Sequence, residues 1–461
     1  MLAAFDMLHQ YDEENAEILE ELVAESERGY QIPNAEFDNY RVKRGLREPD
    51  GTGVMAGVTR ICNAHGYVID EGARAPVDGR LYYRGYRMSD LCENFVAENR
   101  FGFAECCYLL FFGRLPTATQ LERFTTLLDR YARLPARFDE DILMKAPSPS
   151  IMNKMATGVL SLYAYDDNPD ETTLSNMLRQ SMQLVARLPV IAAHTYAVYR
   201  NVFGGHGLNL HNPKDGLATA ENFLRMLRPD KSYTDEEAKL LDLCLVIHAE
   251  HGGGNNSSFA CRVLSSSGTD TYSAVSAAIG SLKGPRHGGA NIKVQEMFDC
   301  IKENVRDYKD DEELMSFLAK ILQGEANDHS GLIYGMGHAI YTKSDPRAVM
   351  LKQHARSLAC KKGYGDDFAL LESIERLTPE VFRRYKGLDK TMCANVDLYS
   401  GLIYRMLNIP TFMYTPLFAI ARASGWCAHR IEEFMTAKRI IRPAYKCITG
   451  HQTYVPLHER K

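Results

Sequence analysis

The sequence of 461 residues lacks the features that several classes of protein require. Its net charge is only −5, from 54 Lys and Arg against 59 Asp and Glu, so the chain has no overall attraction to nucleic-acid phosphates or anionic membranes. A membrane-spanning helix needs about 20 mostly apolar residues. The charge-free stretch 406–421 is interrupted by Asn408, Pro410 and Pro416, and we expect it to be buried core. No nucleic-acid partner and no membrane partner are expected.

Metal, disulfide and secretion signals are also missing. The 11 cysteines are scattered and include no Cys-x-x-Cys pair, so we expect reduced, mostly buried thiols and no metal site. The N-terminus becomes acidic within about a dozen residues, unlike a secretory or transit signal, and this predicts a cytoplasmic protein. A complete P-loop, a dinucleotide-binding glycine fingerprint and a nucleophile elbow are absent, which leaves phosphoryl transfer, redox and serine hydrolase chemistry without support.

Helical spacing of apolar residues dominates what is present. Apolar residues among acidic ones at 12–27 predict a solvated N-terminal helix, and from Met88 onward helical segments end at glycine and proline, as at Gly113 and Pro116. Only 58–83 combines β-branched and aromatic residues with glycine turns, which is typical of one or two short hairpins. The sequence therefore predicts an all-α protein with a short hairpin region near its N-terminus.

Three glycine-rich segments, 248–254, 284–289 and 335–338, each contain histidine. His248 and His251 lie three residues apart on one face of a predicted helix that the glycines end. They either point into one site or cap the end of that helix. A metal site is a third interpretation, but it would need further ligands that the sequence does not supply near them.

The other two glycine-rich segments suggest groups that can act on a carbonyl. His287 precedes two glycines, and a helix starting soon after it would favour a neutral imidazole that donates to a developing enolate. His338 follows Gly335 and Gly337, and Arg347, in an Asp-Pro-Arg turn, can present its guanidinium to the same site. The alternatives are an ordinary glycine turn and a surface Asp-Pro turn with an incidental arginine.

A carboxylate and two more arginines follow. Asp397 begins an apolar helical run, where burial would raise its pKa toward that of a useful base, although an ordinary N-cap aspartate is the alternative. Arg422 and Arg442 stand in largely apolar surroundings and need anionic partners. With Arg347 they are enough to hold a small di- or tricarboxylate. This set of groups fits carbanion chemistry on a carboxylate substrate.

Taken together, the motifs resemble the citrate synthase family. The resemblance covers roughly 55–446 and implies an all-α homodimer with an N-terminal extension at 1–50, a large helical domain of 51–286 plus 397–461, and a small mobile domain at 287–396 whose closure would exclude water. The motifs occur in the family's order and are HAEHGGGNNSSF, LKGPRHGGAN, GMGHAIYTKSDPRA, NVDLYSG, TPLFAIARASGWCAH and RPAYK.

The resemblance also implies roles for single residues. Asp397 matches the base that removes a methyl proton from acetyl-CoA, His287 the group that stabilises the resulting enol, and His338 the group that polarises the oxaloacetate carbonyl. No metal and no tightly bound cofactor is implied, with acetyl-CoA as co-substrate. His248, Arg347 and Arg422 match groups that hold the substrate carboxylates. Arg442 matches an arginine that comes from the partner subunit. Gly335, Gly337 and Lys390 match positions that contact CoA.

Some positions depart from the family pattern. Ala339 and Thr342 stand where many bacterial members have Arg and Lys, and 150–153 replaces a His-Pro-Met pattern. We expect these changes to affect CoA affinity and local packing but not the central site.

The expected activity is citrate synthesis from acetyl-CoA and oxaloacetate through an enolate, with hydrolysis of citryl-CoA. The alternatives are a 2-methylcitrate synthase that uses propionyl-CoA, a non-catalytic metabolite-binding helical dimer, and a metal-dependent hydrolase built on His248 and His251.

Overall fold

The chain forms two compact units in the computed structural model, which describes residues 15–70, 73–387, 391–437 and 439–460. One unit comprises Met1–Gly57 with Arg442–Lys461, and the other comprises Val58–Ile441. The described helices of the first unit are α2 (Ala16–Gly29), α3 (Asn34–Asn39) and the short 3-10 turns Arg44–Leu46 and Leu457–Glu459. The helix predicted at 12–27 is confirmed over its described part as α2, and its apolar residues are solvent-exposed: Ile18, Leu19, Leu22 and Val23.

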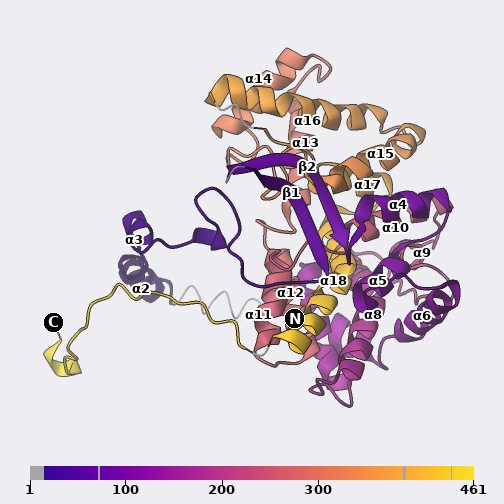
Figure 1. Cartoon of the computed structure of the whole chain (residues 1–461), viewed down its shortest axis with the longest axis horizontal. Coiled ribbons are helices and arrows are strands. Elements are labelled where there is room, and N and C mark those ends of the chain that lie inside the picture. Colours follow the sequence, from indigo (N-terminus) through magenta and orange to yellow (C-terminus); the bar gives the residue numbers. More distant parts are fainter. Residues whose placement is uncertain (1–14, 71–72, 388–390, 438, 461) are drawn as a thin grey trace. The chain divides into compact units, whose positions relative to one another are not determined.

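The second unit is built mainly from helices (Figure 1), which enclose one large hydrophobic core. Short 3-10 or π-helical turns are at Asp139–Met144, Leu162–Tyr165 and Thr411–Met413. Its α-helices, in chain order, are α4 (Met88–Ala97), α5 (Phe103–Phe112), α6 (Ala118–Tyr131), α7 (Ile151–Ser161), α8 (Leu174–Val202), α9 (Thr219–Leu227), α10 (Asp235–His248), α11 (Asn256–Ser266), α12 (Thr271–Lys283), α13 (Ala290–Asn304), α14 (Asp311–Gln323), α15 (Pro346–Lys361), α16 (Gly365–Lys386), α17 (Val396–Met406) and α18 (Tyr414–Thr436).

One antiparallel sheet accompanies these helices. Its strands, β1 (Cys62–Asp70), β2 (Ala73–Tyr83) and β3 (Tyr86–Arg87), are hydrogen-bonded in the order β1-β2-β3. Cys62 pairs with Tyr83, and a register shift between His65 and Tyr67 marks a bulge. No other strands occur in the parts of the chain that the structure describes. The prediction of an all-α fold with a short hairpin region is confirmed.

Helix α18 forms the centre of the core. Every residue from 414 to 430 is buried, and α18 packs against α5, α8, α10, α11 and α12. A helix that is apolar or small-residued on all sides is stable only when it is enclosed by other elements. The segment 406–421, predicted to be core, contributes the end of α17 and the first part of α18. No described helix is both long and apolar enough to span a membrane.

The segment that departs from the family pattern at 150–153 still begins a helix. Ser150 has an extended backbone, and its hydroxyl accepts a hydrogen bond from the amide of Asn153 at 3.3 Å, which makes it the N-cap of α7. A serine cap satisfies one of the free amides of the first helical turn. The replacement therefore preserves the start of this helix.

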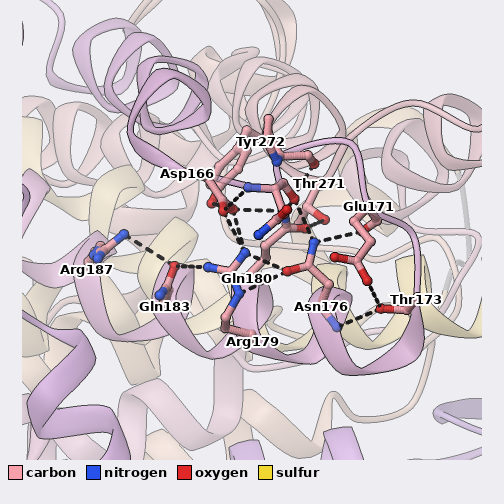
Figure 2. A network of polar contacts seen from close by, with 12 residues as sticks. Asp166, Glu171, Thr173, Asn176, Arg179, Gln180, Gln183, Arg187, Thr271 and Tyr272 are labelled. Carbon is pink, nitrogen blue, oxygen red and sulfur yellow. Dashed lines mark hydrogen bonds and ion pairs between the residues drawn. The ribbon is translucent and has the colours of Figure 1, made fainter.

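A buried carboxylate joins α8 and α12 (Figure 2). Asp166, in the segment between α7 and α8, accepts hydrogen bonds from Arg179 at 2.6 Å, Gln180 at 3.0 Å and the Tyr272 hydroxyl at 2.6 Å. Thr271 donates to Gln180 at 2.5 Å. Because a buried carboxylate is stable only when its oxygens are satisfied, these contacts fix the start of α12, the helix that leads to His287.

The hairpin connects two segments that are far apart in sequence. At one end, the Tyr83 hydroxyl lies 3.1 to 3.2 Å from three backbone carbonyls at the end of α10. Farther along the hairpin, a Cβ on Gly66 would lie 2.5 Å from the Ile340 carbonyl oxygen, and one on Gly79 would lie 2.2 Å from that of Ser344. The Gly79 amide also donates to the Ser344 hydroxyl at 3.2 Å. Only glycine allows this close approach to the loop before α15.

We expect Gly79→Ala to displace the loop before α15, because its methyl group would overlap the Ser344 carbonyl. The expected loss in the free energy of unfolding is about 1 to 3 kcal/mol, measured by urea denaturation. Gly280→Ala is the control, since Gly280 lies in α12 with open space around its Cβ position, and it should gain up to about 1 kcal/mol. Equal stability of the two variants would contradict the close contact.

Candidate active site

The predicted site residues of the second unit converge from five segments of the chain. The end of α10, the loop after α12, the loop before α15, the start of α17 and the middle of α18 each contribute. Phe418 packs against three of their side chains. Its ring centre lies 4.6 Å from that of His248, 6.5 Å from that of His287 and 4.8 Å from the guanidinium carbon of Arg422.

Arg422 is a fully buried cation with unused donors. Its exposed fraction is 0%, its Nε donates to the His248 carbonyl at 2.7 Å, and its Nη1 and Nη2 have no partner. Burial lowers the pKa of this guanidinium, but arginine stays protonated in proteins. Two free donors on a planar cation match the two oxygens of a carboxylate. The geometry therefore suits the binding of an anionic group.

Arg347 is held by a buried carboxylate. Its Nε and Nη2 donate to the two oxygens of Asp345 at 3.0 and 2.7 Å, and Asp345 also caps α15. Both side chains are buried, so the Asp-Pro-Arg segment is the buried start of a helix and not a surface turn. Burial alone would lower the pKa of Arg347, but the ion pair raises it above its ordinary value.

His338 contacts this arginine directly. Its Nε2 lies 3.3 Å from the Arg347 Nη2, and its Nδ1 accepts hydrogen bonds from the backbone amides of Ile340 and Tyr341 at 3.1 and 3.2 Å. The imidazole stacks on the Tyr341 ring at 4.8 Å. Arginine can only donate, so both ring nitrogens of His338 face donors, and these contacts by themselves select neither tautomer.

His248 is a buried, neutral histidine at the end of α10. Its Nδ1–H donates to the Cys244 carbonyl at 2.8 Å, and its Nε2 is buried without a partner. Burial is the main cause that lowers its pKa to about 3. The sequence left open whether His248 points into a site or only caps the end of its helix. The bond to the Cys244 carbonyl fits the capping role, but it uses only Nδ1 and leaves Nε2 unpaired.

His251 was not among the predicted site residues, yet it lies in the middle of them. Its ring centre is 5.1 Å from that of His338, and its Nε2 is buried without a partner. Burial first, and then the charges of Arg347, His338 and Arg422, hold its pKa well below the ordinary value. The sequence signal for a role of His251 was its position directly before the glycines at 252–254, where the chain turns toward the site.

His287 contacts a serine that the sequence did not single out. Its Nε2 lies 3.0 Å from the Ser257 hydroxyl, which also accepts from the Trp426 indole at 3.0 Å and contacts the Asn255 side-chain oxygen at 2.9 Å. Burial and the charge of Arg422 lower the pKa of His287 to about 4, so it is neutral at pH 7. From the sequence we expected a helix that starts soon after His287 to favour the neutral imidazole, and α13 does begin at Ala290.

Asp397 is the carboxylate with the pKa closest to neutrality in the site. Asn395, not Asp397, caps α17, and its side chain accepts the Asp397 amide at 3.0 Å. Burial raises the pKa of Asp397 to about 6, and Asp345 adds to this, while Arg347 and Arg422 oppose it. A base with this pKa is about half ionised near pH 6 and mostly ionised at pH 7.

Gly335 and Gly337 bring two of these segments together. The Gly337 amide donates to the Cys393 carbonyl at 2.8 Å, and the Asn395 amide donates to the Gly335 carbonyl at 2.8 Å. Both glycines have positive φ angles, +80° and +83°. This pairing places the loop of His338 beside the start of α17. Contact of these glycines with CoA stays a prediction.

Two further predicted residues, Arg442 and Lys390, fall outside the described part of the second unit. Arg442 is solvent-exposed and belongs to the other compact unit. Lys390 lies outside the residues that the structure describes. Among the described residues, no group of three or more His, Cys, Asp or Glu side chains is arranged to hold a metal ion.

The sequence model of the citrate synthase C-terminal domain matches residues 50–444. The chain belongs to the citrate synthase family. Members of this family are enzymes of the acyltransferase type.

Relatives within the citrate synthase family carry two different names. A citrate synthase of Synechocystis sp. is 33% identical over 426 residues, which cover 92% of this chain and 95% of the relative. The 2-methylcitrate synthase 1 of Corynebacterium glutamicum is 32% identical over 391 residues, which cover 84% and 93%. Sequence similarity alone therefore does not separate these two activities.

Solved structures of citrate synthases share the fold. The enzyme from Pyrobaculum aerophilum aligns with a TM-score of 0.70 and 30% identity, covering 89% of this chain and 94% of that one. The ternary complex of citrate synthase from Thermoplasma acidophilum with carboxymethyl coenzyme A and oxaloacetate aligns with a TM-score of 0.73 and 25% identity, covering 91% and 99%.

We expect Ser257→Ala to misorient His287, because the serine hydroxyl is the hydrogen-bond partner of its Nε2. Oxaloacetate-dependent release of CoA should fall about 10- to 100-fold in kcat. Ser258→Ala is the matched control, since the Ser258 hydroxyl is buried without a partner and its removal should be neutral or stabilising. A kcat for Ser257→Ala equal to that of the control would remove Ser257 from the site.

Proposed function

We propose that this protein is a citrate synthase, which condenses acetyl-CoA with oxaloacetate and hydrolyses citryl-CoA to citrate and CoA. The observation that carries the proposal is the combination of a base with a pKa of about 6, Asp397, and a neutral imidazole, His287, beside a buried arginine with two free donors. Proton abstraction next to a thioester needs such a base together with a donor for the enolate oxygen.

In the proposed mechanism each group acts on one atom. Asp397 takes a proton from the methyl group of acetyl-CoA, and His287 donates a hydrogen bond to the enolate oxygen that forms. The enolate carbon attacks the keto carbon of oxaloacetate, whose oxygen accepts a hydrogen bond, and then a proton, from His338. Water then attacks the citryl thioester, and CoA leaves as the thiol. The buried site strengthens each of these contacts.

The cations and neutral histidines form the proposed oxaloacetate site. Arg422 offers its free donors to one carboxylate, and Arg347, fixed by Asp345, offers its guanidinium to the same substrate. His248 was the histidine predicted to help hold the carboxylates. The unpartnered Nε2 of His251, which lies against His338, makes His251 a second candidate for this role.

The proposed reaction also involves a partner subunit, a mobile domain and contacts to CoA. We propose a homodimer in which the exposed Arg442 reaches the active site of the partner, a mobile small domain at 287–396, and CoA contacts at Gly335, Gly337 and Lys390. The Thermoplasma structure is a ternary complex with carboxymethyl coenzyme A and oxaloacetate, which supports the binding of both kinds of ligand in one site.

Synthesis of 2-methylcitrate from propionyl-CoA is the second candidate, because 2-methylcitrate synthases are among the relatives. One extra methyl group in an apolar pocket changes binding by only about 1 to 3 kcal/mol. Thiol release from acetyl-CoA and propionyl-CoA, with and without oxaloacetate, tests both candidates. Strict oxaloacetate dependence with a higher kcat/KM for acetyl-CoA supports citrate synthesis. A preference for propionyl-CoA assigns 2-methylcitrate synthesis, and no reaction, with oxaloacetate still raising the Tm, assigns a binding protein.

We expect Asp397→Asn to lower kcat by about 1000-fold or more, because an amide cannot accept the methyl proton. Oxaloacetate should still raise the Tm of this variant, since its carboxylates bind elsewhere in the site. Asp299→Asn is the control, as Asp299 is a partly exposed carboxylate paired with Arg405, and its turnover should be near normal. Turnover of Asp397→Asn close to that of the control would exclude Asp397 as the base.

We expect kcat/KM to fall on the acidic side with a pKa of about 6, the value of Asp397. The carboxylate must be ionised to act as base, so the rate should decrease about tenfold per pH unit below pH 6. His287 stays neutral in this range because its pKa is about 4. The residual activity of Asp397→Asn should not show this decrease. A flat profile from pH 7 to pH 5, with folding verified by circular dichroism, would contradict the assignment.

A further inference from the structure

Glu250 is a buried carboxylate for which the proposed mechanism has no use. We propose that Glu250 is a positioning residue that acts on the substrate through Arg422: it supplies the counter-charge of this guanidinium without occupying its donors, and so limits how tightly the site holds a carboxylate. This inference rests on the proposed function, because oxaloacetate is the anion that Arg422 would bind.

The two charges are close to each other in the fold but are not hydrogen-bonded. Both side chains are 0% exposed. The Arg422 Nε bonds to the carbonyl of His248, two residues before Glu250, and the Glu250 carboxylate lies against Gly425, one turn beyond Arg422 on α18. Glu250 is the carboxylate that most favours the charged form of Arg422. Nevertheless, Arg422 Nη1 and Nη2 and one oxygen of Glu250 have no partner.

A chain of buried contacts holds Glu250 in place. Its Oε1 accepts from His429 Nε2 at 2.9 Å and from the backbone amide of Gly252 at 2.5 Å. On the other side of the imidazole, Arg262 Nη2 lies 2.6 Å from His429 Nδ1. Arginine can only donate, so His429 Nδ1 accepts, and its Nε2–H donates to Glu250. Arg262 is itself paired with Glu433 at 2.6 Å.

Arg422 and the residues of α18 that contact this chain lie in one stripe along the helix. Arg422, Gly425, His429 and Glu433 are spaced three or four residues apart, which places them on one face of a helix. A Cβ on Gly425 would lie 2.0 Å from the Glu250 Oε2. Glycine at this position therefore makes room for the carboxylate against the helix that carries Arg422.

The contacts that orient Arg422 determine how loss of the Glu250 charge would change anion binding. Its guanidinium is oriented by the His248 carbonyl and by the Phe418 ring, and neither contact involves Glu250. Loss of the Glu250 charge would leave Arg422 in position with an uncompensated charge. In a buried site such a charge attracts anions more strongly. Substrate and inorganic anions should then bind more tightly, and release should slow.

Glu250→Gln in the full-length protein tests this, because glutamine keeps the shape and an oxygen for His429 and Gly252. We expect the KM for oxaloacetate to fall at least about threefold, kcat to fall as well, and competitive inhibition by inorganic sulfate to strengthen at least about threefold. Glu237→Gln is the control, since Glu237 is a buried carboxylate at the start of α10 that pairs with Arg228 and takes no part in this chain, and it should change neither KM nor sulfate inhibition. A raised or unchanged KM in Glu250→Gln would overturn the proposal.

A stability measurement covers the case in which Glu250→Gln does not fold. If Glu250 serves Arg422, each single variant leaves one buried charge uncompensated. The double variant Glu250→Gln/Arg422→Met should therefore have a higher Tm than either single variant. A double variant no more stable than the singles would overturn the proposal. Absence of oxaloacetate-dependent thiol release in the unaltered protein would instead refute the proposed function, and the stability comparison would still test the coupling of the two charges.

Discussion

The buried positive charge of Arg422 is the constraint on which the site depends. A guanidinium at the centre of a core helix is stable only if the surrounding structure compensates its charge and orients its donors. The His248 carbonyl and Phe418 orient it, while Glu250, His429 and Arg262 form the charged and polar layer behind it. Because this layer takes none of the outer donors, a substrate carboxylate can still be bound there.

The same burial prepares the groups proposed to act on the substrate. Removal from water disfavours charge, so it raises the pKa of Asp397 to about 6 and lowers that of His287 to about 4. One physical effect thus yields an ionisable base and a neutral hydrogen-bond donor in the same site near pH 7. The nearby cations Arg347 and Arg422 oppose this rise at Asp397 and so favour its ionised form.

Close backbone approaches set the distances between these groups. Gly79 allows the hairpin to contact the loop before α15, Gly335 pairs with the segment before α17, and Gly425 admits the Glu250 carboxylate next to α18. Of these three glycines, only Gly335 belongs to a glycine-rich segment that stood out in the sequence, and it is a packing position as well as a turn. Its pairing places the loop of His338 beside the start of α17, and His338 also lies within contact distance of His251.

The sequence by itself determined the helical class, the hairpin at 58–83 and membership of the citrate synthase family, because apolar periodicity and long ordered motifs are local properties of a chain. It could not show that Asn395 caps α17, that His251 lies against His338, that Ser257 contacts His287, or that Glu250 contacts His429. Those facts depend on which distant segments pack together and on how burial shifts each pKa. Only the tertiary structure decides both, since contact distance and desolvation are properties of the folded chain.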